Sequence, residues 1–131
     1  MPYTGEIAGF GGDWSATALA ALVSYAAGLD PARISADSNL PAQIAGYWNQ
    51  STGSFGTPSS NGAAFGILAL RHTPVPNWAL APSVAFLRRT QHDDGGWEYT
   101  ASLTPEEKEA PGAADMTGAA IAAMCEAGVP A

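Results

Sequence analysis

The sequence predicts an all-α protein built from stacked helical hairpins. Three observations carry this prediction. Alanine-rich stretches end in helix-stop signals, apolar residues recur at helical spacing, and related segments repeat along the chain. Phe10, Phe55 and Trp97 mark equivalent places in successive copies. Strand signals are weak throughout, so we expect almost no sheet.

The repeated plan is clearest in two segments, "GDWSATALAALVSYAAGLDPA" at 12–32 and "ADMTGAAIAAMCEAGVPA" at 114–131. Each has Asp, a large apolar residue, Ser or Thr, an alanine-rich stretch, Gly and then Pro. The segment "SSNGAAFGILALRHTPVP" at 59–76 is a degenerate middle copy. We therefore expect helices over 15–27, 60–71 and 115–127.

Helix ends are marked in the first and last copies. Asp13 and Asp115 are expected N-caps, because a carboxylate accepts hydrogen bonds from free N–H groups and suits the helix dipole. Gly28 and Gly128 fit the left-handed position after a helix, and a proline follows each of them. The spacing of apolar residues predicts one buried stripe on the first helix, formed by Leu19, Leu22, Val23 and Ala26.

Two further helices, over 38–50 and 78–91, are expected between the alanine-rich ones. Both segments run from Pro through helical residues to Gln, a short polar link and an aromatic residue. Alanine-rich helices can pack closely on both sides, so we expect them inside and the Gln-bearing helices outside. The expected buried residues of the outer pair are Ile44, Tyr47, Trp48, Leu80, Val84 and Leu87.

Composition bounds the organisation and the function. The chain has 131 residues, 47% of them apolar, which is enough for one domain over 1–131 with repeat units near 1–32, 38–76 and 78–131. Five basic residues and a net charge of −7 argue against nucleic acid and anionic membrane surfaces. No apolar run approaches about 18 residues, so no membrane span is predicted. With a single cysteine the chain forms no internal disulfide, so the sequence does not indicate an oxidising or a reducing compartment.

The stretch "QHDDGGW" carries a family resemblance. Gln91, Asp94, Gly95 and Trp97 match the Gln-x-x-Asp-Gly-x-Trp repeat of squalene-hopene and related terpene cyclases. The wider pattern, Gly-Gly-aromatic followed by Asp-x-Ser/Thr and an alanine-rich helix, resembles the repeat of the prenyltransferase and terpene-cyclase superfamily. The resemblance implies an α/α toroid whose inner helices line a cavity. This chain would supply about two and a half repeats of it.

In that family the Gln and Trp of the motif tie neighbouring helices together and do no chemistry. The residues agree with such a structural motif, which comprises Gln91, Asp94, Gly95, Gly96 and Trp97. Gln91 can bond backbone groups of a neighbouring turn, Asp94 before two glycines suits a turn, and Trp97 offers a large apolar face. An acid pair of Asp93 and Asp94, or a calcium loop, is the weaker interpretation. The chain lacks the Asp-x-Asp-Asp acid of proton-initiated cyclases and offers few carboxylates for calcium.

Catalytic chemistry has little support. Protein prenyltransferases carry the zinc ligands Asp-x-Cys at the start of an inner helix, where this chain has Asp13-Trp14-Ser15 and Asp115-Met116-Thr117. A hydroxyl is a poor zinc ligand. Cys125 lies deeper in the last helix and is expected to be a small core residue. His72 and His92 have no spacing that closes a site, and no Ser-His-Asp signature is present. We predict no catalytic residue, metal or cofactor.

An insert over 98–114 separates Trp97 from the last helix. Within it, Thr104-Pro105-Glu106-Glu107 is typical of a cap, a first-turn proline and an acidic first turn. Two interpretations remain open. The insert is a solvated loop with one turn of helix, or it is a lid or binding loop over the mouth of the helical array.

The predicted function is a non-catalytic prenyltransferase- or terpene-cyclase-like helical-repeat module that binds an apolar small molecule or a protein partner. The alternative is a fragment or divergent member of an isoprenoid-processing enzyme. Apolar faces without neighbours predict a homo-oligomer or the remainder of a longer toroid. The candidate binding residues, on the inner helices, are Asp13, Trp14, Tyr25, Phe65, Asp115 and Met116.

Overall fold

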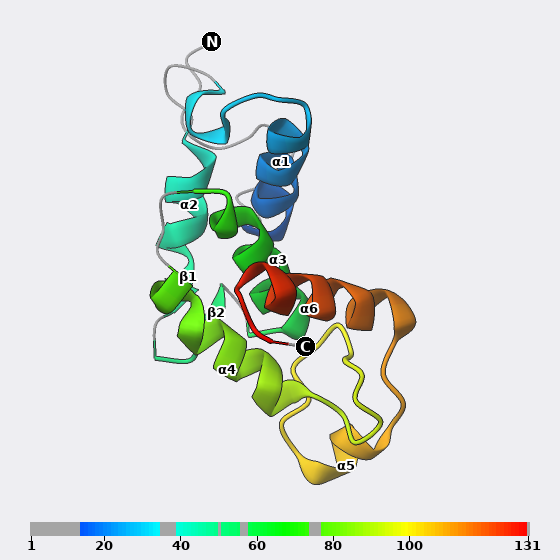
Figure 1. Ribbon diagram of the computed structural model, residues 1–131. Helices are drawn as coiled ribbons and strands as arrows, with labels where there is room; N and C mark the ends of the chain where they lie inside the picture. The colour runs from blue at the N-terminus through cyan, green and yellow to red at the C-terminus, as the bar shows by residue number, and fades with distance from the viewer. Residues whose placement is uncertain (1–13, 35–38, 50, 56–57, 74–76, 131) are drawn as a thin grey trace.

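The computed structural model describes residues 14–34, 39–49, 51–55, 58–73 and 77–130, and for residues 14–16, 77 and 78 it describes the backbone (Figure 1). These residues are mainly helical, which confirms the all-α class. The elements in chain order are α1 (Trp14–Ala26), η1 (Pro31–Arg33), α2 (Leu40–Gly46), β1 (Trp48–Asn49), β2 (Ser54–Phe55), α3 (Ser60–Arg71), η2 (Asn77–Leu80), α4 (Ala81–Thr90), α5 (Pro105–Glu109) and α6 (Ala114–Glu126).

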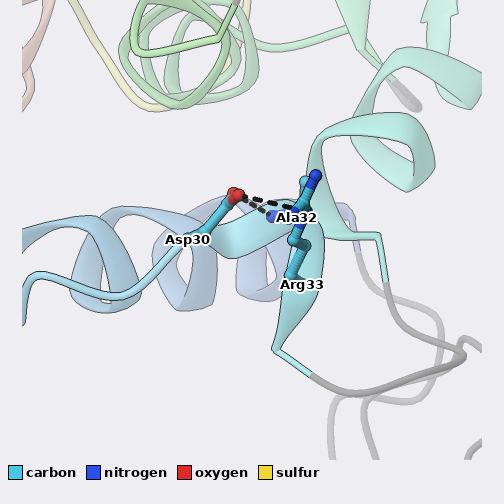
Figure 2. Close-up of polar contacts among 3 residues, drawn as sticks. All are labelled: Asp30, Ala32 and Arg33. Carbon is cyan, nitrogen blue, oxygen red and sulfur yellow. Dashed lines mark hydrogen bonds and ion pairs between the residues drawn. The ribbon is translucent and has the colours of Figure 1, made fainter.

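Several helices begin at a polar side chain that accepts a hydrogen bond from the first turn. Ser59 Oγ accepts from the Gly62 N–H of α3 at 2.9 Å, and Asn39 Oδ1 accepts from the Ala42 N–H of α2 at 3.0 Å. Asp30 accepts from the Ala32 N–H of η1 at 2.9 Å, and its other oxygen lies 3.8 Å from Arg33 Nε (Figure 2). This ion pair is exposed and adds little stability.

The predicted stops after α1 and α6 are confirmed. Gly28 and Gly128 have φ of +78° and +83°, the left-handed region that glycine adopts without strain. At the first stop, the Leu29 N–H donates to the Ser24 carbonyl and the Gly28 N–H donates to the Tyr25 carbonyl. These bonds satisfy carbonyl groups that the helix end would otherwise leave free.

Helix α3 lies at the centre and contacts α1, α2, α4 and α6 (Figure 1). Ser60 Oγ, at its start, donates to Thr90 Oγ1 at the end of α4, so these two helices form an antiparallel hairpin. At its other end, the Arg71 side chain donates to the Glu126 carbonyl at the end of α6. The central position agrees with the expected inner place of this alanine-rich helix. Closure into a toroid stays a prediction.

The core lies between α3 and its neighbours. Phe55, Ile67 and Leu87 are fully buried there. Gly66 of α3 faces the Phe55 ring so closely that a Cβ atom would lie 2.4 Å from it. A glycine is therefore required at this point for the ring to reach the helix. None of the described helices is both long and apolar enough to cross a membrane.

The helix predicted over 38–50 is shorter than expected. It ends at Gly46, and Trp48 and Asn49 pair instead with Phe55 and Ser54 in a two-stranded antiparallel sheet. Of the three residues expected to form its stripe, Ile44 is buried, whereas Tyr47 is 39% exposed. The Trp48 indole donates to Ser83 Oγ of α4. Tertiary contacts with α4 and β2 thus hold this segment out of the helix.

The stripe predicted for α1 is wrong at Leu19, Val23 and Ala26, which are exposed, whereas Leu22 is half-buried against the core. Val23 is 68% exposed and Leu19 is 47% exposed, whereas the buried residues are Thr17, Ala18 and Ala21. Helix α1 packs against α2 and α3. Small side chains let its backbone approach these helices closely, which turns the larger apolar residues outward.

Candidate functional site

The motif "QHDDGGW" forms a tight turn directly after α4. Gly95 has a φ of +88°, and its N–H donates to the His92 carbonyl at 3.0 Å. The His92 N–H in turn donates to the Gly96 carbonyl at 2.8 Å. Gln91 Nε2 donates to the Gly95 carbonyl at 2.8 Å, so it bonds within its own turn and not to a neighbouring one. A bond from the end of α4 back into the turn fixes the direction in which the chain leaves the helix.

Trp97 joins this turn to two helices. Its side chain is 3% exposed, and the indole N–H donates to the Leu87 carbonyl of α4 at 2.7 Å. Its backbone N–H donates to Thr117 Oγ1 of α6 at 3.0 Å. The Ala113 N–H donates to its carbonyl at 2.8 Å, just before α6 begins. The residue therefore combines a large buried apolar area with polar ties on both sides.

Asp94 holds two backbone segments through its two oxygens. The Gly96 N–H donates to Oδ1 at 2.8 Å, and the Gly112 N–H donates to Oδ2 at 3.0 Å. These bonds, that of Gly96 first and that of Gly112 second, lower the pKa of the Asp94 carboxyl below its ordinary value. The group is ionised at neutral pH and holds no proton to donate. This geometry supports the structural interpretation of the motif over an acid.

His92 is a buried polar residue that sequence reasoning missed. It is 4% exposed, with Nδ1 2.6 Å from the Ala110 carbonyl oxygen and Nε2 2.7 Å from Ser102 Oγ. A carbonyl oxygen only accepts, so Nδ1 carries a hydrogen, and in the neutral ring Nε2 accepts from the Ser102 hydroxyl. A serine beside a histidine resembles a nucleophile and its base. Ser102 is also 4% exposed, so it is closed to a substrate, and the pair holds the insert in place.

The sequence carries no signal for this network, because the partners of His92 lie 10 and 18 residues further along an irregular loop. The insert itself behaves as predicted at one point. Helix α5 spans Pro105–Glu109, and Thr104 Oγ1 accepts from the Glu107 N–H at 3.3 Å. Local residue order predicts both the cap and the first-turn proline.

A cleft of about 150 Å³ opens between the first turns of α3 and α6. Its lining is mainly apolar. Three of the candidate binding residues, Phe65, Asp115 and Met116, meet there. The other lining residues are Asn61, Tyr99, Ala113 and Ala119. Tyr99 comes from the insert, which therefore contributes one side of the cleft.

The remaining candidate residues do not join them. Tyr25 lies near the end of α1, where its ring stacks on His72 with centroids 4.0 Å apart. His72 is the C-cap of α3, so this pair sits at the opposite end of α3 from the cleft. Trp14 is the first residue of α1, and its side chain lies outside the described atoms, as does Asp13 altogether.

Asp115 is not the N-cap of α6 as predicted. Ala113 holds that position, where its methyl group offers no acceptor to the first turn, and its backbone N–H donates to the Trp97 carbonyl. Asp115 is the second residue of the helix, and its Oδ1 accepts from the Met116 N–H at 2.8 Å. The side chain is exposed at the rim of the cleft.

Sequence reasoning also missed Asn61 and Tyr99. The repeat held a usable signal for Asn61, because it stands in the middle copy where Asp115 stands in the last one. Cys125, expected in the core, is exposed. Within the described residues, no group of three His, Cys, Asp or Glu side chains could hold a metal ion.

Comparison of the chain with protein-family models, with curated proteins and with solved structures finds no match. The resemblance to prenyltransferases and terpene cyclases therefore rests on the motif residues themselves.

Proposed function

We propose that this chain is a non-catalytic helical-repeat module that binds an apolar group in the cleft between α3 and α6. The observation that carries the proposal is the lining of that cleft. Phe65 and Met116 supply apolar surface from two helices, and Ala119 leaves room between them. Removing apolar ligand surface from water there favours binding by about 25 cal/mol per Å². No serine, threonine, cysteine, histidine or lysine side chain lies among the lining residues.

The experiment uses a neutral, environment-sensitive dye, Nile red, as an apolar probe. Ala119→Leu places a larger side chain into the cleft and is expected to weaken dye binding about tenfold or more. Ala122→Leu is the matched control, since Ala122 lies one turn further along the same helix and is exposed. Thermal melting of both variants checks the fold. Equal affinity of the Ala119→Leu variant and the unmodified protein would overturn the proposal.

A second candidate is a divergent or partial isoprenoid-processing enzyme. The match of Gln91, Asp94, Gly95 and Trp97 to the cyclase repeat favours it. Turnover of a prenyl diphosphate or a linear triterpene by the purified chain would support this candidate. Binding of such a compound without any product would favour the non-catalytic module.

We also propose that the chain associates with a second copy of itself. Ile67, Leu19 and Ile121 occupy the same place in the three alanine-rich copies, six residues after Asn61, Asp13 and Asp115. Ile67 of the central helix is 0% exposed, whereas Leu19 is 47% and Ile121 is 52% exposed. The repeat position that is covered in the middle is uncovered on both flanking helices, and repeats bury such positions by stacking on further repeats.

Sedimentation velocity at micromolar concentration tests this association. We expect a dimer that Leu19→Glu or Ile121→Glu dissociates, because a carboxylate in an apolar interface must be desolvated. Leu103→Glu is the control, since Leu103 is 58% exposed in the insert. A monomer at every concentration would exclude association through these faces.

A further inference from the structure

We propose that the cleft between α3 and α6 selects organic cations, namely ligands with an apolar body and a protonated amine. This inference rests on the proposed function, since it names the class of ligand for the same cleft. Its basis is the juxtaposition of a carboxylate without an ion-pair partner among the described residues, an amide and two aromatic residues in a mainly apolar lining.

The carboxylate of Asp115 is available to a ligand. Oδ1 accepts from the Met116 N–H, and no described residue donates to Oδ2. In the part of the chain that the structure describes, the ion pair found is that of Asp30 with Arg33, which lies on another element. No lysine or arginine lines the cleft. A protonated amine at Oδ2 would thus gain a charge-assisted hydrogen bond without displacing a protein cation.

The aromatic residues favour the same ligand class. The side chains of Phe65 and Tyr99 line the cleft, and aromatic faces attract a cation that lies over them. Asn61 lines it as well and offers an amide oxygen as a second acceptor. The net charge of −7 adds a long-range field that concentrates cations near the surface.

An anionic ligand is the competing possibility, because the positive ends of the α3 and α6 dipoles lie beside the cleft. An anion would need free N–H groups at these helix starts. The Asn61 N–H already donates to the Tyr99 carbonyl, the Gly62 N–H donates to Ser59 Oγ, and the Met116 N–H donates to Asp115. The partial dipole charge also faces a full negative charge on Asp115. The balance of these effects favours a cation.

The test compares three probes with one hydrocarbon chain: hexylamine, hexanol and hexanoate. Binding is measured by calorimetry at neutral pH and about 0.15 M salt, where long-range attraction is screened. We expect hexylamine to bind about tenfold more tightly than hexanol, and hexanoate to bind least tightly. Asp115→Asn should bring hexylamine down to the level of hexanol. Asparagine keeps an acceptor oxygen for the Met116 N–H, so the helix start is retained.

Glu126→Gln is the matched control, since it removes one negative charge at the far end of the same helix. It should leave the preference for hexylamine unchanged. Equal binding of hexylamine and hexanol would overturn the cation preference while the proposed apolar cleft stands. Failure of all three probes to bind would overturn both. A preference that persists in Asp115→Asn would show that net charge, and not this carboxylate, attracts the amine.

Discussion

The two links that lead from an outer helix to an aromatic residue, 49–55 and 91–97, solve the same problem with different residues. Each places a glycine of positive φ two residues before the aromatic, Gly53 at +79° and Gly95 at +88°. Each aromatic side chain is buried, with Phe55 0% and Trp97 3% exposed. The shared part of the motif is therefore the left-handed glycine and the large ring.

The two links differ in the hydrogen-bond partners of their polar residues. Among the described residues of 49–55 the polar side chains bond locally, with Asn49 Oδ1 accepting from the N–H and the hydroxyl of Ser51. In 91–97 they reach the insert, with Asp94 bonded to Gly112 and His92 bonded to Ser102 and Ala110. Only the second link is followed by a long insert. The ring and the glycine therefore pack the core, and the added polar residues anchor the insert.

The largest expected effect comes from removing either ring. Phe55→Ala and Trp97→Ala should each lower the free energy of unfolding by about 3–5 kcal/mol, because both rings are buried in the core. Trp97→Phe keeps most of the apolar area but removes the indole bond to the Leu87 carbonyl, which still accepts from the Thr90 hydroxyl, so we expect a cost of about 1 kcal/mol. Urea denaturation measures these values. A loss confined to Trp97 would show that the two links are not equivalent.

Replacing the glycine of each link with alanine should cost different amounts of stability in the two links. A Cβ atom at Gly53 would lie 2.0 Å from the Pro82 carbonyl oxygen of α4, so Gly53→Ala must displace backbone. At Gly95 the nearest atom would lie 3.9 Å away, so Gly95→Ala meets only the left-handed conformation, which costs about 1–2 kcal/mol. We expect the loss of stability in Gly53→Ala to be clearly larger than this value in the same denaturation experiment. A smaller loss for Gly53→Ala than for Gly95→Ala would contradict the close approach of the first link to α4.

Local residue order predicted much of the fold. Helix α3 spans Ser60–Arg71 as expected, and the stops at Gly28 and Gly128 and the cap of α5 at Thr104 were also found. These features depend on neighbours in sequence, such as a capping side chain or a glycine that accepts positive φ. Signals of this kind depend little on tertiary contacts.

What sequence reasoning missed depends on distant partners. Trp48 leaves its predicted helix because β2 and Ser83 hold it, and Leu19 turns outward because Ala18 packs more closely. The residues of the candidate site were also predicted only in part. Phe65 and Met116 were found from their place on inner helices, whereas Tyr99 enters the cleft from an irregular insert. Periodicity cannot foresee a contact across a loop.

His92 should control the insert without much effect on the core. His92→Phe removes the donor to the Ala110 carbonyl and the partner of the Ser102 hydroxyl, at a cost of about 1–3 kcal/mol. Trypsin should then cut after Lys108 faster than in the unmodified protein, because α5 is released. Cleavage after Arg33, which lies on a remote element, should keep its rate. Unchanged cleavage at Lys108 would show that other contacts hold the insert.

Asp94 is expected to have the smallest effect, and its effect should depend on pH. The bonds from the Gly96 and Gly112 N–H groups lower its pKa in the folded chain below the ordinary value of 3.8. A carboxyl whose folded pKa is depressed stabilises the fold fully above the unfolded pKa, and this contribution is lost as pH falls through the folded pKa.

Asn at this position has one acceptor oxygen, so Asp94→Asn can keep only one of the two bonds and loses the titration. The stability advantage of the unmodified protein over Asp94→Asn should therefore be constant near pH 7 and shrink below about pH 4. Denaturation at a series of pH values measures it, with Asp93→Asn as the control for a neighbouring exposed carboxylate. An advantage that stays constant down to about pH 2 would mean that Asp94 acts by shape and not by charge.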